Sequence, residues 1–230
     1  MKINNITILG DSILKCVVYD KETTKYKSTG DEKFNKLSEA LLVNVNNLSR
    51  LGLTAKRAYD KEMYKISNET DLIILGLGGN DCDYIWKEIS EEPDIEHDNN
   101  TPPAEFKSLM ITMINYIRSN SIKVALMTLP PISSDKYFEK LSVGLNKDNL
   151  IKWIKDVNQI YRTQEFYSNT VRDIAVELNV PLIDVRGNFL VHKDNHKLIG
   201  SDGIHMNEAG YDLMIDVLID YIKKFREEKI

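Results

Sequence analysis

Two uninterrupted apolar runs restrict the folds that are open to this chain. Residues 72–77 read Leu-Ile-Ile-Leu-Gly-Leu, without the alternation of polar and apolar residues that a half-exposed strand shows. Residues 124–127, Val-Ala-Leu-Met, have the same character. Strands of this kind are covered by protein on both faces, which is typical of a parallel sheet between two layers of helices. We therefore predict an α/β protein.

Shorter apolar runs and helical patterns complete this prediction. The predicted strands are residues 5–9, 42–46, 72–77, 123–128 and 181–184. The predicted helices are 32–41, 55–66, one that starts after Thr101-Pro102-Pro103, a long one over 147–178 that is bent or broken, and one capped by Asn207. This alternation predicts a doubly wound five-stranded parallel sheet with right-handed crossovers. Ligands of such sheets bind beyond the carboxyl ends of the strands.

The bulk properties limit the partners and the compartment. The 230 residues suit one compact domain over 1–230. A net charge of −5 argues against nucleic-acid binding and gives no attraction to an anionic membrane surface. We see no signal peptide and no membrane span, and two cysteines are too few for a disulfide framework. We therefore expect a cytoplasmic protein without stable membrane association, in an oligomeric state that the sequence leaves open.

A serine follows the first predicted strand directly, in Gly10-Asp11-Ser12. A strand that stops abruptly can hold a serine hydroxyl at the open edge of the sheet, where a nucleophile would have to lie. The same three residues are also a common turn composition. Ser12 becomes a candidate nucleophile only if another segment supplies a base.

A possible base lies near the other end of the chain, in Asp202-Gly203-Ile204-His205. A carboxylate three residues before a histidine can bind one ring nitrogen and leave the other free to take a proton. A histidine that only hydrogen-bonds the start of the last helix is the plain alternative. His192 and His196 raise the possibility of a metal cluster, but their spacing matches no zinc signature. We predict no metal site and no cofactor.

Glycine-rich segments follow two other predicted strands. Gly78-Gly79-Asn80-Asp81 comes after the strongest strand, where the amide of Asn80 could be aimed at a developing oxyanion. Its glycine spacing does not fit a dinucleotide fingerprint. Gly52 could point its backbone N–H into the same site. A local Asn-Asp turn and an ordinary loop glycine are the alternatives.

Together the four segments resemble the SGNH hydrolases, also called GDSL esterases and lipases, in order and approximate spacing over nearly the whole chain. The resemblance implies a flavodoxin-like three-layer α/β/α sandwich and a serine ester hydrolase. It implies Ser12 as nucleophile, His205 as general base and Asp202 as its partner. It also implies an oxyanion hole formed by the N–H groups of Ser12 and Gly52 and the side chain of Asn80. Ile13 replaces the usual leucine, a packing change that leaves the chemistry intact.

Two long irregular stretches, 84–101 and 129–146, are expected to be binding loops or solvated surface insertions. Tyr84, Trp86 and Tyr137 lie in them and could bind substrate or pack as satellite core residues. Cys16 and Cys82 each follow a site segment. We hypothesise that one of them lies close enough to Ser12 to make the activity sensitive to thiol reagents, although buried filler residues are the plain alternative.

The leading interpretation is an enzyme that cleaves a small or water-soluble carboxylic ester, with an acetylated carbohydrate as the narrower candidate substrate. A lysophospholipase, an acyl-thioesterase and acyl transfer to an acceptor other than water use the same mechanism and stay open. A binding module that keeps the sandwich without catalysis is the alternative of another class. The intact set Ser12, Asn80, Asp202 and His205 argues against that module.

Overall fold

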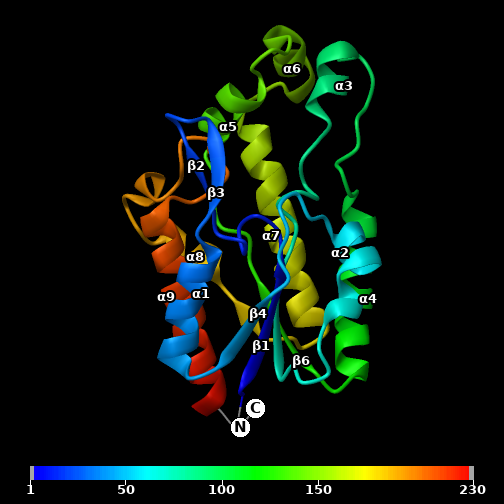
Figure 1. The fold of residues 1–230 in the computed structure, drawn as a ribbon. Helices are drawn as coiled ribbons and strands as arrows, with labels where there is room; N and C mark the ends of the chain where they lie inside the picture. Colours follow the sequence, from blue (N-terminus) through cyan, green and yellow to red (C-terminus); the bar gives the residue numbers. More distant parts are fainter. Residues whose placement is uncertain (1–2, 228–230) are drawn as a thin grey trace.

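The computed structural model describes residues 3–227 and has a parallel sheet at its centre (Figure 1). The five strands lie in the order β4-β1-β5-β6-β7. Their bounds are β1 Asn5–Gly10, β4 Asn44–Asn47, β5 Leu72–Gly76, β6 Lys123–Met127 and β7 Leu182–Ile183. Every pairing is parallel. This strand order is that of flavodoxin-like folds, as the resemblance implied.

Helices cover both faces of the sheet and make the outer layers of an α/β/α sandwich (Figure 1). One face carries α1 (Gly30–Leu41), α8 (Val185–Leu190) and α9 (Glu208–Glu227). The other face carries α2 (Ala55–Lys61), α4 (Pro103–Ser119) and α7 (Asn158–Glu177). All residues of β5 are buried, which explains its uninterrupted apolar sequence.

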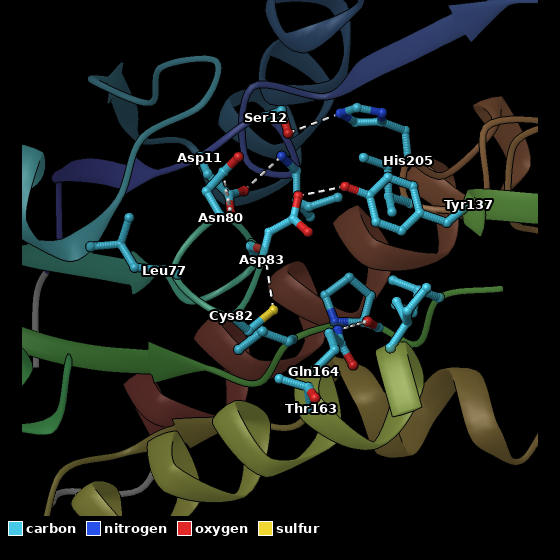
Figure 2. A pocket seen from close by; sticks show the side chains of 18 of the residues that line it. Asp11, Ser12, Leu77, Asn80, Cys82, Asp83, Tyr137, Thr163, Gln164 and His205 are labelled. Atoms are coloured by element: carbon cyan, nitrogen blue, oxygen red, sulfur yellow. Dashed lines mark hydrogen bonds between the residues drawn. The ribbon is translucent and has the colours of Figure 1, made fainter. Parts of the chain in front are cut away.

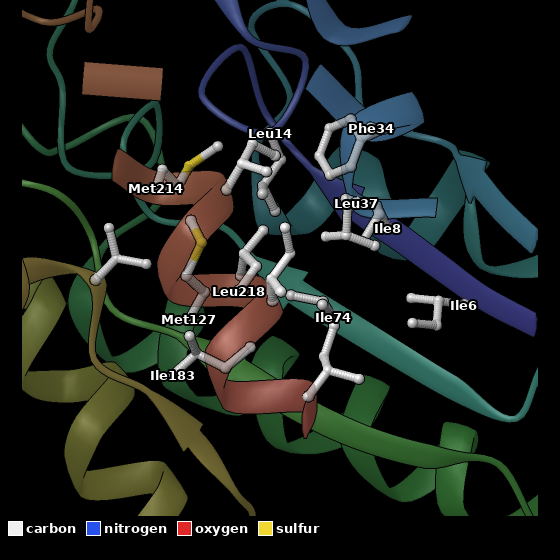
Figure 3. Close-up of a cluster of buried hydrophobic side chains, with 14 of the residues drawn as sticks. Ile6, Ile8, Leu14, Phe34, Leu37, Ile74, Met127, Ile183, Met214 and Leu218 are labelled. Carbon is white, nitrogen blue, oxygen red and sulfur yellow. The ribbon is translucent and has the colours of Figure 1, made fainter. Parts of the chain in front are cut away.

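The side chains between the sheet and helices α1 and α9 form one contiguous core, and Figure 3 shows part of it. Leu14, directly after the Ser12 turn, is fully buried in it. Gly10 and Gly76 pair across β1 and β5, and a Cβ on either would come within 2.6 Å of a Leu14 side-chain atom. The two glycines therefore let the Ser12 turn fold down onto the carboxyl ends of the central strands.

Several helix predictions are confirmed, and several need correction. Pro103 opens α4, and Asn207 caps α9 by accepting from the Gly210 N–H at 3.0 Å. The long helix is broken as expected, because Lys155 takes a positive φ of 62° between α6 (Lys147–Ile154) and α7. Residues 55–66 are not one helix, since α2 ends at Lys61 and a short 3-10 helix, η1 (Met63–Lys65), follows. A second 3-10 helix, η2, covers Asn195–Lys197.

The two stretches predicted as irregular each contain a helix. These are α3 (Trp86–Glu91) and α5 (Ser134–Leu141), and with α6 they form a separate apolar cluster at the carboxyl end of the sheet (Figure 1). The sequence analysis also missed a hairpin of β2 (Val17–Asp20) and β3 (Lys25–Ser28). The site described next lies between these additions and the strand ends.

Candidate active site

Ser12, His205 and Asp202 form a continuous hydrogen-bonded series, although they come from opposite ends of the chain. His205 Nε2 lies 2.9 Å from Ser12 Oγ, and His205 Nδ1 lies 2.6 Å from Asp202 Oδ2. A carboxylate accepts, so Nδ1 carries the proton and Nε2 is left to accept the Ser12 proton. All three residues are buried. The sheet brings them together because β1 and the loop before α9 both end at its carboxyl edge.

The loop that carries Asp202 and His205 is held by its own backbone. Asp202 Oδ1 accepts from the His205 N–H at 3.1 Å, and the Gly200 N–H donates to the His205 carbonyl at 2.7 Å. Gly203 has a φ of 84°, and its carbonyl accepts from the Ser133 N–H at 2.8 Å. A Cβ on Gly203 would lie 2.3 Å from the Tyr137 nitrogen, so only glycine lets this loop approach the start of α5.

Asn80 lies beside the Ser12 turn and lines the same cavity, as Figure 2 shows. Its Nδ2 makes only long contacts, 3.3 Å to Asp11 Oδ2 and 3.4 Å to the Leu53 carbonyl. Gly52 is not among the residues that line the cavity, and its role stays a prediction. Its turn nevertheless adjoins Asn80 through Leu53, and its φ of 67° explains why glycine occupies it.

Two buried carboxyl groups support the loops around Ser12. Asp11 Oδ1 accepts from the Ile13 N–H at 2.9 Å, and Asp81 Oδ1 accepts from the Ala55 N–H at 2.8 Å at the start of α2. Burial raises the pKa of Asp11 to about 6, partly offset by the Ile13 hydrogen bond. Burial likewise raises the pKa of Asp81 to about 6. Neither carboxyl hydrogen-bonds His205, although the charge of His205 is among the smaller effects that lower the pKa of Asp11.

A cavity opens from Ser12 into the protein (Figure 2). The empty space within it is about 800 Å³, a volume that includes space open to solvent. Tyr84, Trp86 and Tyr137, the predicted substrate-binding residues, all line it. Trp86 Nε1 donates to Asp83 Oδ1 at 2.7 Å, and the Tyr137 hydroxyl donates to Asp83 Oδ2. All three aromatic residues also belong to the apolar cluster of α3, α5 and α6, as the satellite-core alternative expected, and substrate binding by them stays a prediction.

This geometry coincides with a family match. Residues 8–213 match the model of the GDSL-like lipase/acylhydrolase family. The chain belongs to this family. It is therefore a carboxylic ester hydrolase of the SGNH/GDSL type.

Solved structures share the fold of this acylhydrolase at low sequence identity. A lipase/acylhydrolase from Enterococcus faecalis is 19% identical with a TM-score of 0.65, and 96% of each chain is covered. A catalytic mutant of an acetylxylan esterase from Geobacillus stearothermophilus is 17% identical with a TM-score of 0.65, again with 96% of each chain covered. An α/β hydrolase from the Lake Arreo metagenome is 18% identical with a TM-score of 0.67, covering 96% of this chain and 95% of the other. No curated protein matches the chain.

The β2–β3 hairpin adds a residue to the acylhydrolase site that the sequence analysis missed. The ring of Tyr26 contacts the imidazole of His205, and Tyr19 packs against Tyr26 with centroids 5.1 Å apart. Lys140 of α5 donates to the Tyr19 hydroxyl at 2.7 Å. Val17, Val18 and Tyr19 are residue types that favour strands, but nothing in the sequence shows that the hairpin reaches His205.

The two cysteines of the acylhydrolase lie on opposite faces of the sheet and do not approach each other. Cys16 is buried between the sheet and helices α1 and α9, whereas Cys82 lines the same cavity as Ser12, towards the Gln164 end (Figure 2). Burial raises the pKa of Cys16 to about 12 and that of Cys82 well above its usual range. Cys82 is therefore the cysteine whose modification could affect the site.

The remaining sequence candidates lie elsewhere. His192 and His196 are exposed, away from His205, and within residues 3–227 no three His, Cys, Asp or Glu side chains gather as a metal site would require. Over the same residues, no helix combines the length and apolar character needed to cross a bilayer.

Proposed function

We propose that this acylhydrolase cleaves small or water-soluble carboxylic esters through an acyl-enzyme on Ser12. The observation that supports this most is the series from Asp202 through His205 to Ser12, with contacts of 2.6 and 2.9 Å. In that geometry His205 accepts the Ser12 proton as Oγ attacks the ester carbonyl carbon. Asp202 keeps Nδ1 protonated and stabilises the imidazolium that forms.

The rest of the cycle follows from the same groups. When the tetrahedral intermediate collapses, the carbon–oxygen bond to the alcohol breaks, and His205 gives its proton to the leaving oxygen. Water then enters, and its oxygen bonds to the acyl carbon while His205 takes its proton. The ester bond to Ser12 breaks, His205 returns the proton to Ser12 Oγ, and the acid is released. We assign stabilisation of the oxyanion to Asn80 Nδ2 and to the backbone N–H groups of Ser12 and Gly52. The long hydrogen bonds of Asn80 support its part, because a donor held weakly at rest can turn to the oxyanion.

Labelling with a fluorophosphonate tests the proposal directly. The probe forms a stable bond to an activated serine, so the wild-type protein should label near neutral pH and Ser12→Ala should not. Ser49→Ala is a matched control, because Ser49 is also buried but does not line the cavity. Absence of labelling in the wild type would favour a binding module without catalysis. Labelling that persists in Ser12→Ala would move the nucleophile elsewhere.

The identity of the ester is the next question within the proposal. Acetylated carbohydrates stay in the panel because structures described as acetyl xylan esterases share this fold. Lysophospholipids, acyl thioesters and p-nitrophenyl esters belong beside them, since all give the same acyl-enzyme. Adding alcohols or sugars to the assay separates hydrolysis from acyl transfer, because a transferase would yield the new ester in preference to the free acid.

A further inference from the structure

Apolar side chains line the cavity away from the reacting atoms. Leu77, Met127, Leu129, Pro130, Ile132 and Ile160 form these walls. In Figure 2, Ser12 and His205 lie at one end of the cavity, and Thr163 and Gln164 of α7 lie at the other. A substrate group that extends towards α7 from the acyl carbon bonded to Ser12 Oγ would therefore pass between apolar walls.

Two polar side chains along this path, those of Asp83 and Thr163, are already hydrogen-bonded within the protein. Both oxygens of Asp83 accept, one from Trp86 and the other from Tyr137. The Thr163 hydroxyl accepts from Gln159 Nε2 at 3.2 Å. A sugar ring in this space would bury hydroxyl groups next to partners that are already engaged, which is unfavourable. An alkyl chain requires no such partners and gains free energy from each buried methylene.

The Gln164 side chain is fixed at the far end of the cavity. Its Nε2 donates to the Pro130 carbonyl at 2.7 Å, and its Oε1 accepts from Arg186 Nη1 at 2.7 Å. Arg186 is only 4% exposed, and its guanidinium lies over the Tyr161 ring at 4.9 Å from the centroid. Because both ends of the amide are held by buried groups, Gln164 forms a rigid wall.

The reaction cycle indicates which part of the ester would lie between the apolar walls of the cavity. The acyl group stays bonded to Ser12 through both half-reactions, whereas the alcohol must leave and water must enter near His205 Nε2. The apolar end of the cavity suits the part that stays, and the end near His205 suits the exchange of alcohol for water. Tyr26 contacts His205, is 45% exposed and does not line the cavity, so it lies on the solvent side of the imidazole.

We infer that this cavity is an acyl pocket for an unbranched apolar chain, and that Gln164 limits the length of that chain. The inference rests on the proposed role of Ser12 and names the acyl class of the same site. It favours esters of longer unbranched acyl groups over the acetyl esters of the narrower sequence expectation. Gln164 is in this account a specificity-determining residue, with Arg186 as the group that positions it.

A series of p-nitrophenyl esters from acetate to decanoate tests the pocket. For the wild type, kcat/KM should rise about fourfold for each added methylene until the chain meets Gln164, and then fall. Gln164→Ala opens space for roughly two or three methylene groups and should move the optimum to longer chains. Ile160→Phe fills the same path and should move the optimum to shorter chains. Arg162→Ala is the control on the exposed face of α7, where Arg162 contacts Asp156 and Gln159, and it should leave the optimum unchanged.

The two substitutions should shift the preferred chain length in opposite directions. Gln164→Ala removes the hydrogen bond to Arg186, and a thermal unfolding curve shows whether this variant still folds. If it does not, the chain-length optimum of Ile160→Phe tests the pocket alone. An acetate optimum in a wild type that labels with fluorophosphonate would overturn the acyl pocket and leave the proposed function intact. A dependence on alcohol length at fixed acyl length, without dependence on acyl length, would overturn it as well. Absence of labelling would instead refute the function of Ser12.

Discussion

The phenol ring of Tyr26 stands edge-on to the imidazole of His205, with ring centroids 5.2 Å apart and planes inclined by 62°. The two residues are far apart in sequence, and the β2–β3 hairpin brings them into contact. His205 is otherwise held by Asp202 at Nδ1 and by the backbone of its own loop. Tyr26 thus supplies a further side-chain contact to the imidazole that we propose as the proton acceptor of Ser12.

Tyr26→Ala should lower kcat with a smaller change in KM, because the imidazole loses a contact that limits its rotation. Aromatic pairs of this kind contribute about 0.5–1.5 kcal/mol, which corresponds to a loss of about two- to twelvefold. Tyr26→Phe keeps the ring and should retain most of the activity. Equal losses in both variants would assign the effect to the hydroxyl group and not to the ring contact.

Asn80→Ala should reduce kcat by about 10²–10³-fold, the usual loss when one oxyanion donor is removed. The fold should persist, since the hydrogen bonds that Asn80 makes at rest are long. Steady-state kinetics and a thermal unfolding curve measure the two effects separately. Asn188→Ala, on the exposed side of α8, is the matched control. Near-normal turnover in Asn80→Ala would remove Asn80 from the oxyanion hole.

Asp81→Asn should stabilise the protein at neutral pH. The pKa of Asp81 rises from 3.8 to about 6 on folding, so the folded state binds more protons than the unfolded state between these values. The stabilisation of the folded state by protonated Asp81 is therefore complete below about pH 4. It is lost as the pH rises through 6, which lowers the free energy of unfolding by roughly 1–3 kcal/mol. An amide stays neutral and its oxygen can still accept from the Ala55 N–H.

Denaturant unfolding between pH 4 and 8 measures this effect. The free energy of unfolding of Asp81→Asn should decrease less than that of the wild type across this pH range. The decrease that remains is due to Asp11. Asp60→Asn, exposed on α2, should follow the wild-type curve. A variant that is less stable than the wild type at pH 7 would contradict the account.

Alkylation of Cys82 should abolish esterase activity slowly, because the group added would occupy the cavity that Ser12 and Cys82 both line. The reaction should be slow, since burial holds the pKa of the thiol well above its usual range and little thiolate is present. Cys82→Ala should be resistant, and Cys16→Ala should lose activity as the wild type does. Full activity after both cysteines are shown by mass spectrometry to be modified would disprove the role of Cys82.

The sheet could be predicted from the sequence because its strands are short, apolar and separated by helices. β5 is buried along its whole length and therefore has no polar position to obscure it. β4 was displaced by two residues at its start, since Leu42 and Val43 look like strand residues but Leu42 ends α1 with a left-handed φ of 53°. Local composition cannot separate the end of a helix from the start of the next strand.

The proposed nucleophile and base could be named from local spacing, whereas the walls of the cavity could not. Asp202 and His205 lie three residues apart, and a short loop fixes their contact. Gln164 is one polar residue on a largely polar helix, and only the tertiary contacts with Pro130 and Arg186 single it out. Such residues carry no sequence signal, because their role depends on packing between segments far apart in the chain.

The close approach of Gly203 to α5 joins the loop of His205, the proposed general base, to a wall of the cavity. Ser133 binds the Gly203 carbonyl, and the backbone of Tyr137 leaves no room for a side chain on Gly203. Any insertion or shift in this first turn of α5 would be transmitted to the imidazole. Efforts to engineer acyl selectivity should therefore exchange side chains at Tyr137 and keep the backbone of residues 133–137 unaltered, because substrate preference and catalytic geometry are mechanically coupled there.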